Sequence, residues 1–231
     1  MKFLAVDTAT EACSLALQIG EQRLSRFVCA GRSHTEQLLP MFQSLLAEAG
    51  LSPGQLDAYV CGVGPGSFAG VRIGVSFVKG LALAQDRPVV AVSSLAMLAA
   101  AAMAQGQERV LCAIDARMDE VYFAAYVRDA AGLPALLGEP RVCAPREVPR
   151  HEGSWAAVGS GWQRYEDSLR AASAAQLSQI DAQALPQAEQ ALRIALPELR
   201  AGRTIGAAQL SPLYLRNKVA LTLIEQRART S

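Results

Sequence analysis

The chain has 231 residues, of which 51% are hydrophobic, with 22 basic and 21 acidic side chains and a formal net charge of +1. This length suits two small lobes or one large domain, and the charge balance excludes a protein that binds nucleic acid over its whole surface. The five cysteines form an odd set without C-x-x-C spacing, which favours reduced thiols over a zinc site or a disulfide framework.

No targeting or membrane segment is expected. The N-terminal apolar stretch meets Asp7 too early for a signal peptide, and the apolar run 89–104 is shorter than the roughly 20 residues of a membrane span. Charge is uneven, because residues 193–231 carry seven basic and two acidic side chains. A solvated helical tail and a direct RNA contact both fit this basic region, and a cytoplasmic protein fits the whole chain.

Hydrophobic periodicity predicts a first half that begins with three strands. Period-two alternation gives these strands and the short turns between them, and two later apolar runs give further strands that are each followed by a helix. Ser33 and Glu36 have the spacing of a capping box at the start of a helix that Gly50 ends. The predicted strands are 3–7, 12–18, 23–29, 57–63 and 89–92, and the predicted helices are 33–49, 71–85 and 94–105.

The opening pattern returns in the second half. Residues 3–19 align without gaps on residues 111–127, which places Asp7 on Asp115 between two apolar strands in both copies. Such a duplicated unit predicts two related lobes, an N-terminal one over 1–106 and a C-terminal one over 107–231. The rest of the second half is predicted as strand 156–159 and helices 162–170, 187–196 and 219–227, the last of which can pack back on the first lobe.

A glycine-rich loop joins strand 57–63 to the helix that follows it. The P-loop pattern fails here because no glycine is followed by Gly-Lys at the required distance. The dinucleotide pattern G-x-G-x-x-A fits residues 64–69, but the acidic ribose ligand expected about 20 residues later is missing. A tight turn whose helix N-terminal amides face solvent or a partner is favoured instead. The loop residues singled out are Gly64, Pro65, Gly66, Ser67, Phe68 and Gly70.

These motifs together resemble one known family. The chain is similar to the TsaB family, also called YeaZ, whose members are bacterial accessory subunits for threonylcarbamoyladenosine formation in tRNA. The similarity is dense over residues 1–127, thin over 128–205, and present again at 212–216. The segments that carry it are 6–17, 34–41, 64–74, 79–82, 92–95, 114–117 and 212–216.

The resemblance implies an α/β fold of two actin-like (ribonuclease H-like) lobes with mixed sheets, the second lobe reduced, as in the superfamily of actin, sugar kinases and Hsp70. There, the two Asp-containing hairpins face each other across an ATP cleft. Asp7, Thr8, Thr10 and Asp115 are therefore candidates for residual nucleotide contact, and capping of turns by the two Asp side chains fits equally well. The second hairpin lacks the Gly, Ser and Thr of a phosphate loop, so independent ATP turnover is not expected.

The resemblance also bears on metal binding. TsaD, the catalytic paralogue, holds a metal with an H-x-x-x-H pair that falls on Ser94 and Leu98 in this sequence, and neither side chain is a suitable ligand. The only histidines, His34 and His151, are too far apart in sequence to replace that pair. No metal ligand is therefore assigned, and His34 fits a plain position at a helix start.

Two helices predict a protein–protein interface. Helix 71–85 has two apolar stripes spanning roughly 200°, about twice what packing on one sheet requires, and helix 33–49 adds roughly 160°. The absent side chain of Gly74 would let a partner helix approach, although the chain's own C-terminal helix, with Leu221, Leu223 and Ile224, could cover these faces instead. The predicted interface residues are Leu38, Leu39, Met41, Phe42, Leu45, Val71, Arg72, Gly74, Val75, Phe77, Val78 and Leu81.

The resemblance and the two helices together imply a non-catalytic subunit. It is expected to bind and activate TsaD, to help recruit the ATPase TsaE, to contact tRNA through the complex, and to form a homodimer when alone. No intrinsic cofactor is expected, because ATP and metal would be held by TsaD and TsaE. Two alternatives stay open, a small ATP-dependent kinase of the same superfamily and a metallopeptidase-like protein.

Overall fold

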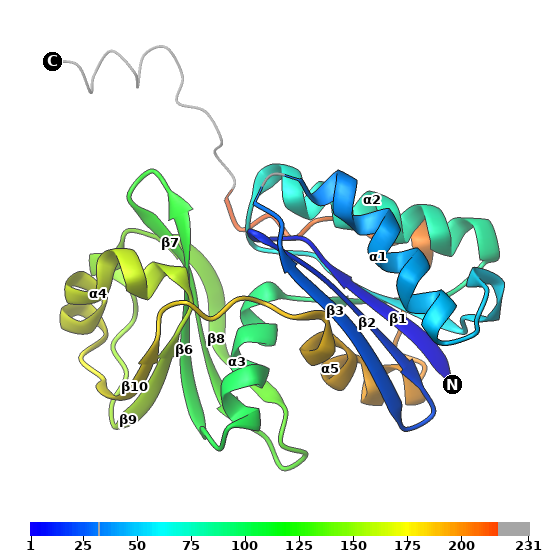
Figure 1. Ribbon diagram of the computed structural model, residues 1–231. Helices are drawn as coiled ribbons and strands as arrows, with labels where there is room; N and C mark the ends of the chain where they lie inside the picture. Colours follow the sequence, from blue (N-terminus) through cyan, green and yellow to red (C-terminus); the bar gives the residue numbers. More distant parts are fainter. Residues whose placement is uncertain (32, 217–231) are drawn as a thin grey trace, which may run out of the picture.

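The computed structural model describes residues 1–31 and 33–216, which form two five-stranded mixed sheets (Figure 1). Both sheets place an antiparallel three-stranded meander beside two parallel strands, in the orders β3-β2-β1-β4-β5 and β8-β7-β6-β9-β10. The first sheet contains β1 (Lys2–Asp7), β2 (Ala12–Ile19), β3 (Gln22–Cys29), β4 (Ala58–Gly62) and β5 (Val89–Val92). The second contains β6 (Arg109–Arg117), β7 (Glu120–Arg128), β8 (Pro134–Cys143), β9 (Ser154–Val158) and β10 (Gln176–Asp181). The shared order confirms the predicted two-lobe α/β fold.

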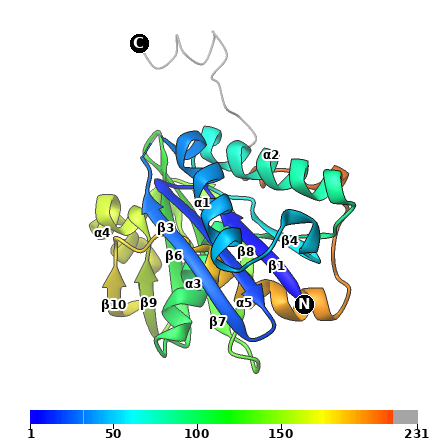
Figure 2. The same cartoon turned by 45° about the vertical axis from the view of Figure 1, so that its right-hand side comes forward.

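The helices cover both faces of each sheet (Figure 2). In the first lobe, α1 (His34–Glu48) and α2 (Phe68–Gln85) lie on one face and α5 (Ala188–Arg200) lies on the other. In the second lobe, α4 (Ser160–Ser173) lies on one face and α3 (Ser94–Ala104) on the other. Because α3 also contacts α5, it lies between the lobes. Three single 3₁₀ turns complete the described elements: η1 (Pro53–Gln55), η2 (Pro145–Glu147) and η3 (Ala207–Gln209).

The continuous apolar sequence of β1 explains why the first sheet is covered on both faces. Leu4 and Val6 face the cluster under α1 and α2, whereas Phe3 and Ala5 face the cluster under α5, and all four are fully buried. Alternation in a strand sends successive side chains to opposite faces, so both faces of β1 are apolar. The turn that follows β1 therefore starts from the centre of the lobe.

The structure differs from the predicted elements at two strands and at the starts of two helices. β8 and β10 were not predicted, because both are edge strands with little buried face, and β8 also contains two prolines. α2 begins at Phe68, three residues earlier than expected, because the side chain of Ser67 caps it. The capping box expected at Ser33 is absent, since its hydroxyl donates to the carbonyl of Ala30 at 2.8 Å.

The chain returns to the first lobe after β10. α5 was assigned to the second lobe but packs on β1, β2, β4 and β5, and residues 201–216 then run beside α2. Lys79 Nζ on α2 donates to the carbonyls of Ala208 at 3.0 Å and Leu210 at 3.2 Å. The boundary at residue 106 thus separates the two sheets, but α5 belongs with the first one. The predicted helix 219–227 lies outside the described residues.

α2 is the one described helix that is long and apolar enough to cross a membrane by length and composition, and 33% of that stretch is buried inside the protein. Its buried side packs on β4 and β1. A helix in the outer layer of a lobe, covered on its sheet-facing side only, is buried to this extent.

Candidate functional site

A cleft of about 1170 Å³ lies between the two lobes. The glycine loop and the first turn of α2 form one wall, and the β6–β7 turn with the start of α4 forms the other. Residues 212–216 line a third side. The cleft therefore lies where the resemblance places the nucleotide of related proteins.

The turn after β1 packs directly on the glycine loop. Ser67 N–H donates to the carbonyl of Ala9 at 2.6 Å, and Thr8 Oγ1 donates to the carbonyl of Gly70 at 2.7 Å. A Cβ added at Gly66 would lie 2.0 Å from Ala9 O, and one at Gly70 would lie 2.2 Å from Thr8 O. The glycines of this loop therefore make room for the chain's own backbone rather than for a phosphate.

Asp7 is fully buried behind that turn and does not line the cleft. Its Oδ2 accepts a long hydrogen bond from Ala9 N–H at 3.4 Å, and its Oδ1 has no partner among the described residues. Burial raises the pKa of this carboxyl to about 7, an effect that the Ala9 bond offsets only in part. The expectation that Asp7 and Thr8 contact a nucleotide is wrong for this structure, because both side chains are enclosed; Thr10 and Asp115 do line the cleft.

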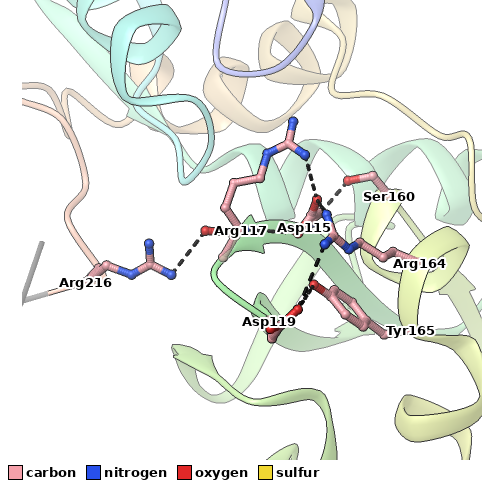
Figure 3. Close-up of polar contacts among 8 residues, drawn as sticks. Asp115, Arg117, Asp119, Ser160, Arg164, Tyr165 and Arg216 are labelled. Atoms are coloured by element: carbon pink, nitrogen blue, oxygen red, sulfur yellow. Dashed lines mark hydrogen bonds and ion pairs between the residues drawn. The ribbon is translucent and has the colours of Figure 1, made fainter. Parts of the chain in front are cut away.

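The Asp115 side chain is 13% exposed and is paired with arginines (Figure 3). Its Oδ2 lies 3.2 Å from a guanidinium nitrogen of Arg117 and 3.2 Å from one of Arg164, and its Oδ1 accepts from Arg117 N–H at 3.0 Å. Its own backbone N–H donates to Ser160 Oγ at 3.1 Å. Arg164 also approaches Asp119 at 3.9 Å. A carboxylate that already binds two guanidinium groups is poorly suited to hold magnesium as well.

Residues 212–216 form a strap that ties the two lobes together across the cleft. Leu213 N–H donates to the carbonyl of Val63 at 2.8 Å in the first lobe. At the other end, Arg216 donates to the carbonyl of Ala116 at 3.1 Å and pairs with Glu120 in the second lobe. In the sequence, this segment is visible only as part of the resemblance, because its contacts join residues about 100 or more positions apart.

The predicted partner interface divides into a buried part and an exposed part. Six of the residues are buried on the sheet-facing sides of α1 and α2, so their assignment to a partner surface is wrong. These are Phe42, Leu45, Val71, Gly74, Val75 and Val78. Leu38 is also largely buried, but it lines the groove between the two helices. Some surface remains accessible at Leu39, Met41, Arg72, Phe77 and Leu81. Gly74 was expected to make room for a partner helix. It makes room for Thr8 of the same chain instead, because a Cβ at position 74 would lie 2.6 Å from Thr8 Oγ1.

The accessible part borders a shallow groove of about 520 Å³ between α1 and α2. Leu39, which is 49% exposed, lies on the α1 side, and Ile73 and Ser76 lie on the α2 side. The floor contains Phe77, whose ring meets that of Phe42 edge-on at a centroid distance of 5.4 Å. An apolar groove of this kind can receive side chains of another helix.

The residues considered above as metal ligands are buried or contact other groups of the chain. Ser94 and Leu98 are both buried in α3, and His34 Nε2 donates to the carbonyl of Thr10 at 2.8 Å. His151 lies between the rings of Phe123 and Trp155. Within residues 1–31 and 33–216, no three His, Cys, Asp or Glu side chains are grouped so that they could hold a metal ion.

Comparison with known proteins gives one answer. The family model described as TsaD, tRNA N6-adenosine threonylcarbamoyltransferase, matches residues 28–222. The chain is 42% identical over 228 residues to the tRNA threonylcarbamoyladenosine biosynthesis protein TsaB of Escherichia coli strain K12, which covers 95% of this chain and 96% of that relative. The chain belongs to the TsaB family. A protein of the same name from Haemophilus influenzae is 39% identical over 231 residues, covering 95% of each chain.

A solved structure agrees with this membership. YeaZ from Pseudomonas aeruginosa matches with a TM-score of 0.86 and 42% sequence identity, covering 93% of this chain and 99% of that one. The resemblance seen in the sequence is therefore confirmed. The arginines that surround Asp115 and the strap across the cleft were not singled out as site residues. The motifs at 114–117 and 212–216 contain Arg117 and the strap, whereas Arg164 lies outside every motif.

Proposed function

We propose that this TsaB-family chain is a non-catalytic cytoplasmic subunit that binds the threonylcarbamoyltransferase TsaD and stabilises its active arrangement. Binding uses the solvent-facing sides of α1 and α2, which pack against the matching helices of TsaD. The same surface forms a homodimer when TsaD is absent. In the complex, the chain helps to recruit the ATPase TsaE and to bring tRNA to the assembly.

The exposed side of α2 is the observation that carries this proposal. The helix is apolar along its length, yet only 33% of it is buried. Leu83 is 58% exposed and Ile73 is half-buried, while the positions between them on the same side are small. Monomeric proteins rarely leave a long apolar helix face uncovered, so a partner is expected there.

Gly80 supports close approach of that partner. A Cβ at Gly80 would meet no atom within 4 Å, so the fold of the isolated chain does not require glycine at this exposed position. A glycine inside a helix costs about 1 kcal/mol relative to alanine. A partner helix that approaches the backbone closely would account for a residue that otherwise only weakens α2.

The cleft supports the non-catalytic part of the proposal. Asp7 is enclosed, and the carboxylate of Asp115 is already paired with Arg117 and Arg164. ATP and metal would then be supplied by TsaD and TsaE. Calorimetric titration with ATP and magnesium tests the kinase alternative, and elemental analysis tests the metallopeptidase alternative. Tight magnesium-dependent ATP binding, or a metal bound at one per chain, would contradict the proposal.

Reconstitution of the tRNA modification with purified TsaD and TsaE tests the proposal directly. Modification should depend on this chain, and Leu39→Glu should weaken association with TsaD at least tenfold, because it places a charge in the apolar groove. Ser44→Glu is the matched control, since Ser44 is exposed on the opposite side of α1. Gly80→Leu should also weaken association while leaving the monomer folded. Modification that proceeds equally well without the chain would refute the proposal.

A further inference from the structure

Exposed apolar side chains gather around the cleft between the lobes. Phe68 is 64% exposed, Met118 56%, Tyr214 56% and Leu213 37%, and all four line this cleft. They come from the glycine loop, the β6–β7 turn and the strap, which are far apart in sequence. Large apolar groups that converge on one concave site usually mark a binding site.

Arg72 stacks over one of these rings and lies close to a second, and the three side chains Phe68, Arg72 and Tyr214 are called the platform. The guanidinium carbon of Arg72 lies 3.3 Å from the centroid of the Phe68 ring and 5.1 Å from that of Tyr214. Arg72 also donates to the hydroxyl of Tyr214 at 2.6 Å and to the carbonyl of Phe68 at 2.8 Å, so its plane is fixed. Arg72 forms no ion pair among the described residues. Aromatic rings and guanidinium planes of this kind stack unpaired nucleobases.

The opposite wall presents guanidinium groups that keep free donors. Arg117 and Arg164 share one oxygen of Asp115, so two positive charges face one carboxylate at this point (Figure 3). Arg117 is 80% exposed, and its pair with Asp115 engages one of its terminal nitrogens. Asp119 lies on the outer side of Arg164 and is 89% exposed. Exposed guanidinium groups beside a stacking platform suit phosphates that follow the stacked bases.

We propose that this cleft binds single-stranded RNA, with bases stacked on the platform of Phe68, Arg72 and Tyr214 and phosphates paired with Arg117 and Arg164. The volume of about 1170 Å³ exceeds the usual range of a small-molecule pocket, which fits a short stretch of chain better than one isolated group. The choice of tRNA as the natural source of that strand rests on the proposed function. The chemistry of the cleft does not depend on it.

The test uses the full chain and a fluorescein-labelled RNA heptanucleotide, with binding followed by fluorescence anisotropy between 25 and 200 mM salt. Phe68→Ser should weaken binding about tenfold and leave the salt dependence unchanged, because it removes stacking. Arg117→Gln should reduce the slope of log K against log salt by about 0.7, because it removes one phosphate contact on a single strand. These two signatures separate a base contact from a charge contact.

Phe27→Ser and Arg146→Gln are the matched controls and should bind like the parent chain. Phe27 is a 46% exposed phenylalanine on β3, and Arg146 is an 83% exposed arginine, and neither lines the cleft. Circular dichroism confirms that each variant is folded. Equal effects of cleft and control substitutions, or equal binding of an RNA duplex, would overturn the proposal.

RNA binding in the cleft and association with TsaD can be tested separately. RNA binding that requires the cleft, in a chain that does not associate with TsaD, would refute the proposed function and support the RNA site. Association with TsaD by a chain that binds no single-stranded RNA at any salt concentration would overturn the RNA site alone. Leu39→Glu should affect only TsaD association, and Phe68→Ser should affect RNA binding.

Discussion

The hairpins that carry Asp7 and Asp115 occupy equivalent places in two sheets with the same strand order, yet their surroundings are opposite. Asp7 is enclosed by the first lobe and has one oxygen without a partner, whereas the carboxylate of Asp115 faces a cleft and pairs with two arginines. One copy of the duplicated unit has become part of a core, and the other has become a charged surface. Neither copy retains an open carboxylate of the kind that could hold magnesium in the cleft.

Gly62→Ala tests the enclosure of Asp7 and should have the largest effect on the free energy of unfolding. An added Cβ would lie 1.9 Å from Asp7 Oδ1, and a buried carboxyl cannot move away without disturbing β1 and β4. We expect a loss of about 3 kcal/mol in the free energy of unfolding, measured by urea denaturation. The double variant Gly62→Ala/Asp7→Ala removes the oxygen that clashes and should recover part of the loss. Additive effects of the two substitutions would show that Asp7 does not confine Gly62.

Asp7→Asn should have the next largest effect, on the pH dependence of stability. The folded-state pKa of about 7 lies above the ordinary value of 3.8, so the folded protein binds a proton that the unfolded chain releases. Stability is therefore full below pH 3.8 and falls as the pH rises to 7. Between pH 5 and pH 8, ionisation of this carboxyl should lower the free energy of unfolding by roughly 2 to 3 kcal/mol. Asp7→Asn should lack this decline.

Urea denaturation at several pH values measures the effect of Asp7→Asn. Asp57→Asn serves as the control, because Asp57 is an exposed acidic residue of the same lobe. Its unfolding curves should change with pH as those of the parent chain do. Parallel pH profiles of the parent chain and Asp7→Asn would show that Asp7 is already charged in the core.

The sequence predicted the elements whose signal is local. Period-two alternation predicted the meander of the first lobe, and the repeat predicted the first two strands of the second, because a buried strand imposes its pattern on its own residues. The edge strands β8 and β10 lack a buried face and so lacked that pattern. The two apolar stripes of α2 were also visible, but the sequence did not show which one faces the sheet. The structure buries Val71, Val75 and Val78 and leaves Ile73 and Leu83 accessible.

Long-range contacts determined what the sequence could not predict at the site. The closeness of Gly62 to Asp7 depends on the register of β4 against β1, and the platform of Phe68 and Tyr214 joins residues almost 150 positions apart. The role of Gly74 was misassigned for the same reason, because Thr8 approaches it from another element. The sequence therefore showed where the glycines are, but not which distant residues approach them.

Asp115→Asn should have the smallest effect on the free energy of unfolding. It should lower that free energy slightly and strengthen binding of the RNA heptanucleotide. Arg117 and Arg164 are 80% and 48% exposed, and ion pairs of such side chains contribute about 1 kcal/mol or less. Urea denaturation should therefore detect only a small loss. Removing the carboxylate also frees two guanidinium groups, so the RNA heptanucleotide should bind more tightly and with a steeper salt dependence. A loss of stability as large as that of Gly62→Ala would mean that Asp115, like Asp7, is part of a core, and the contrast between the two lobes would disappear.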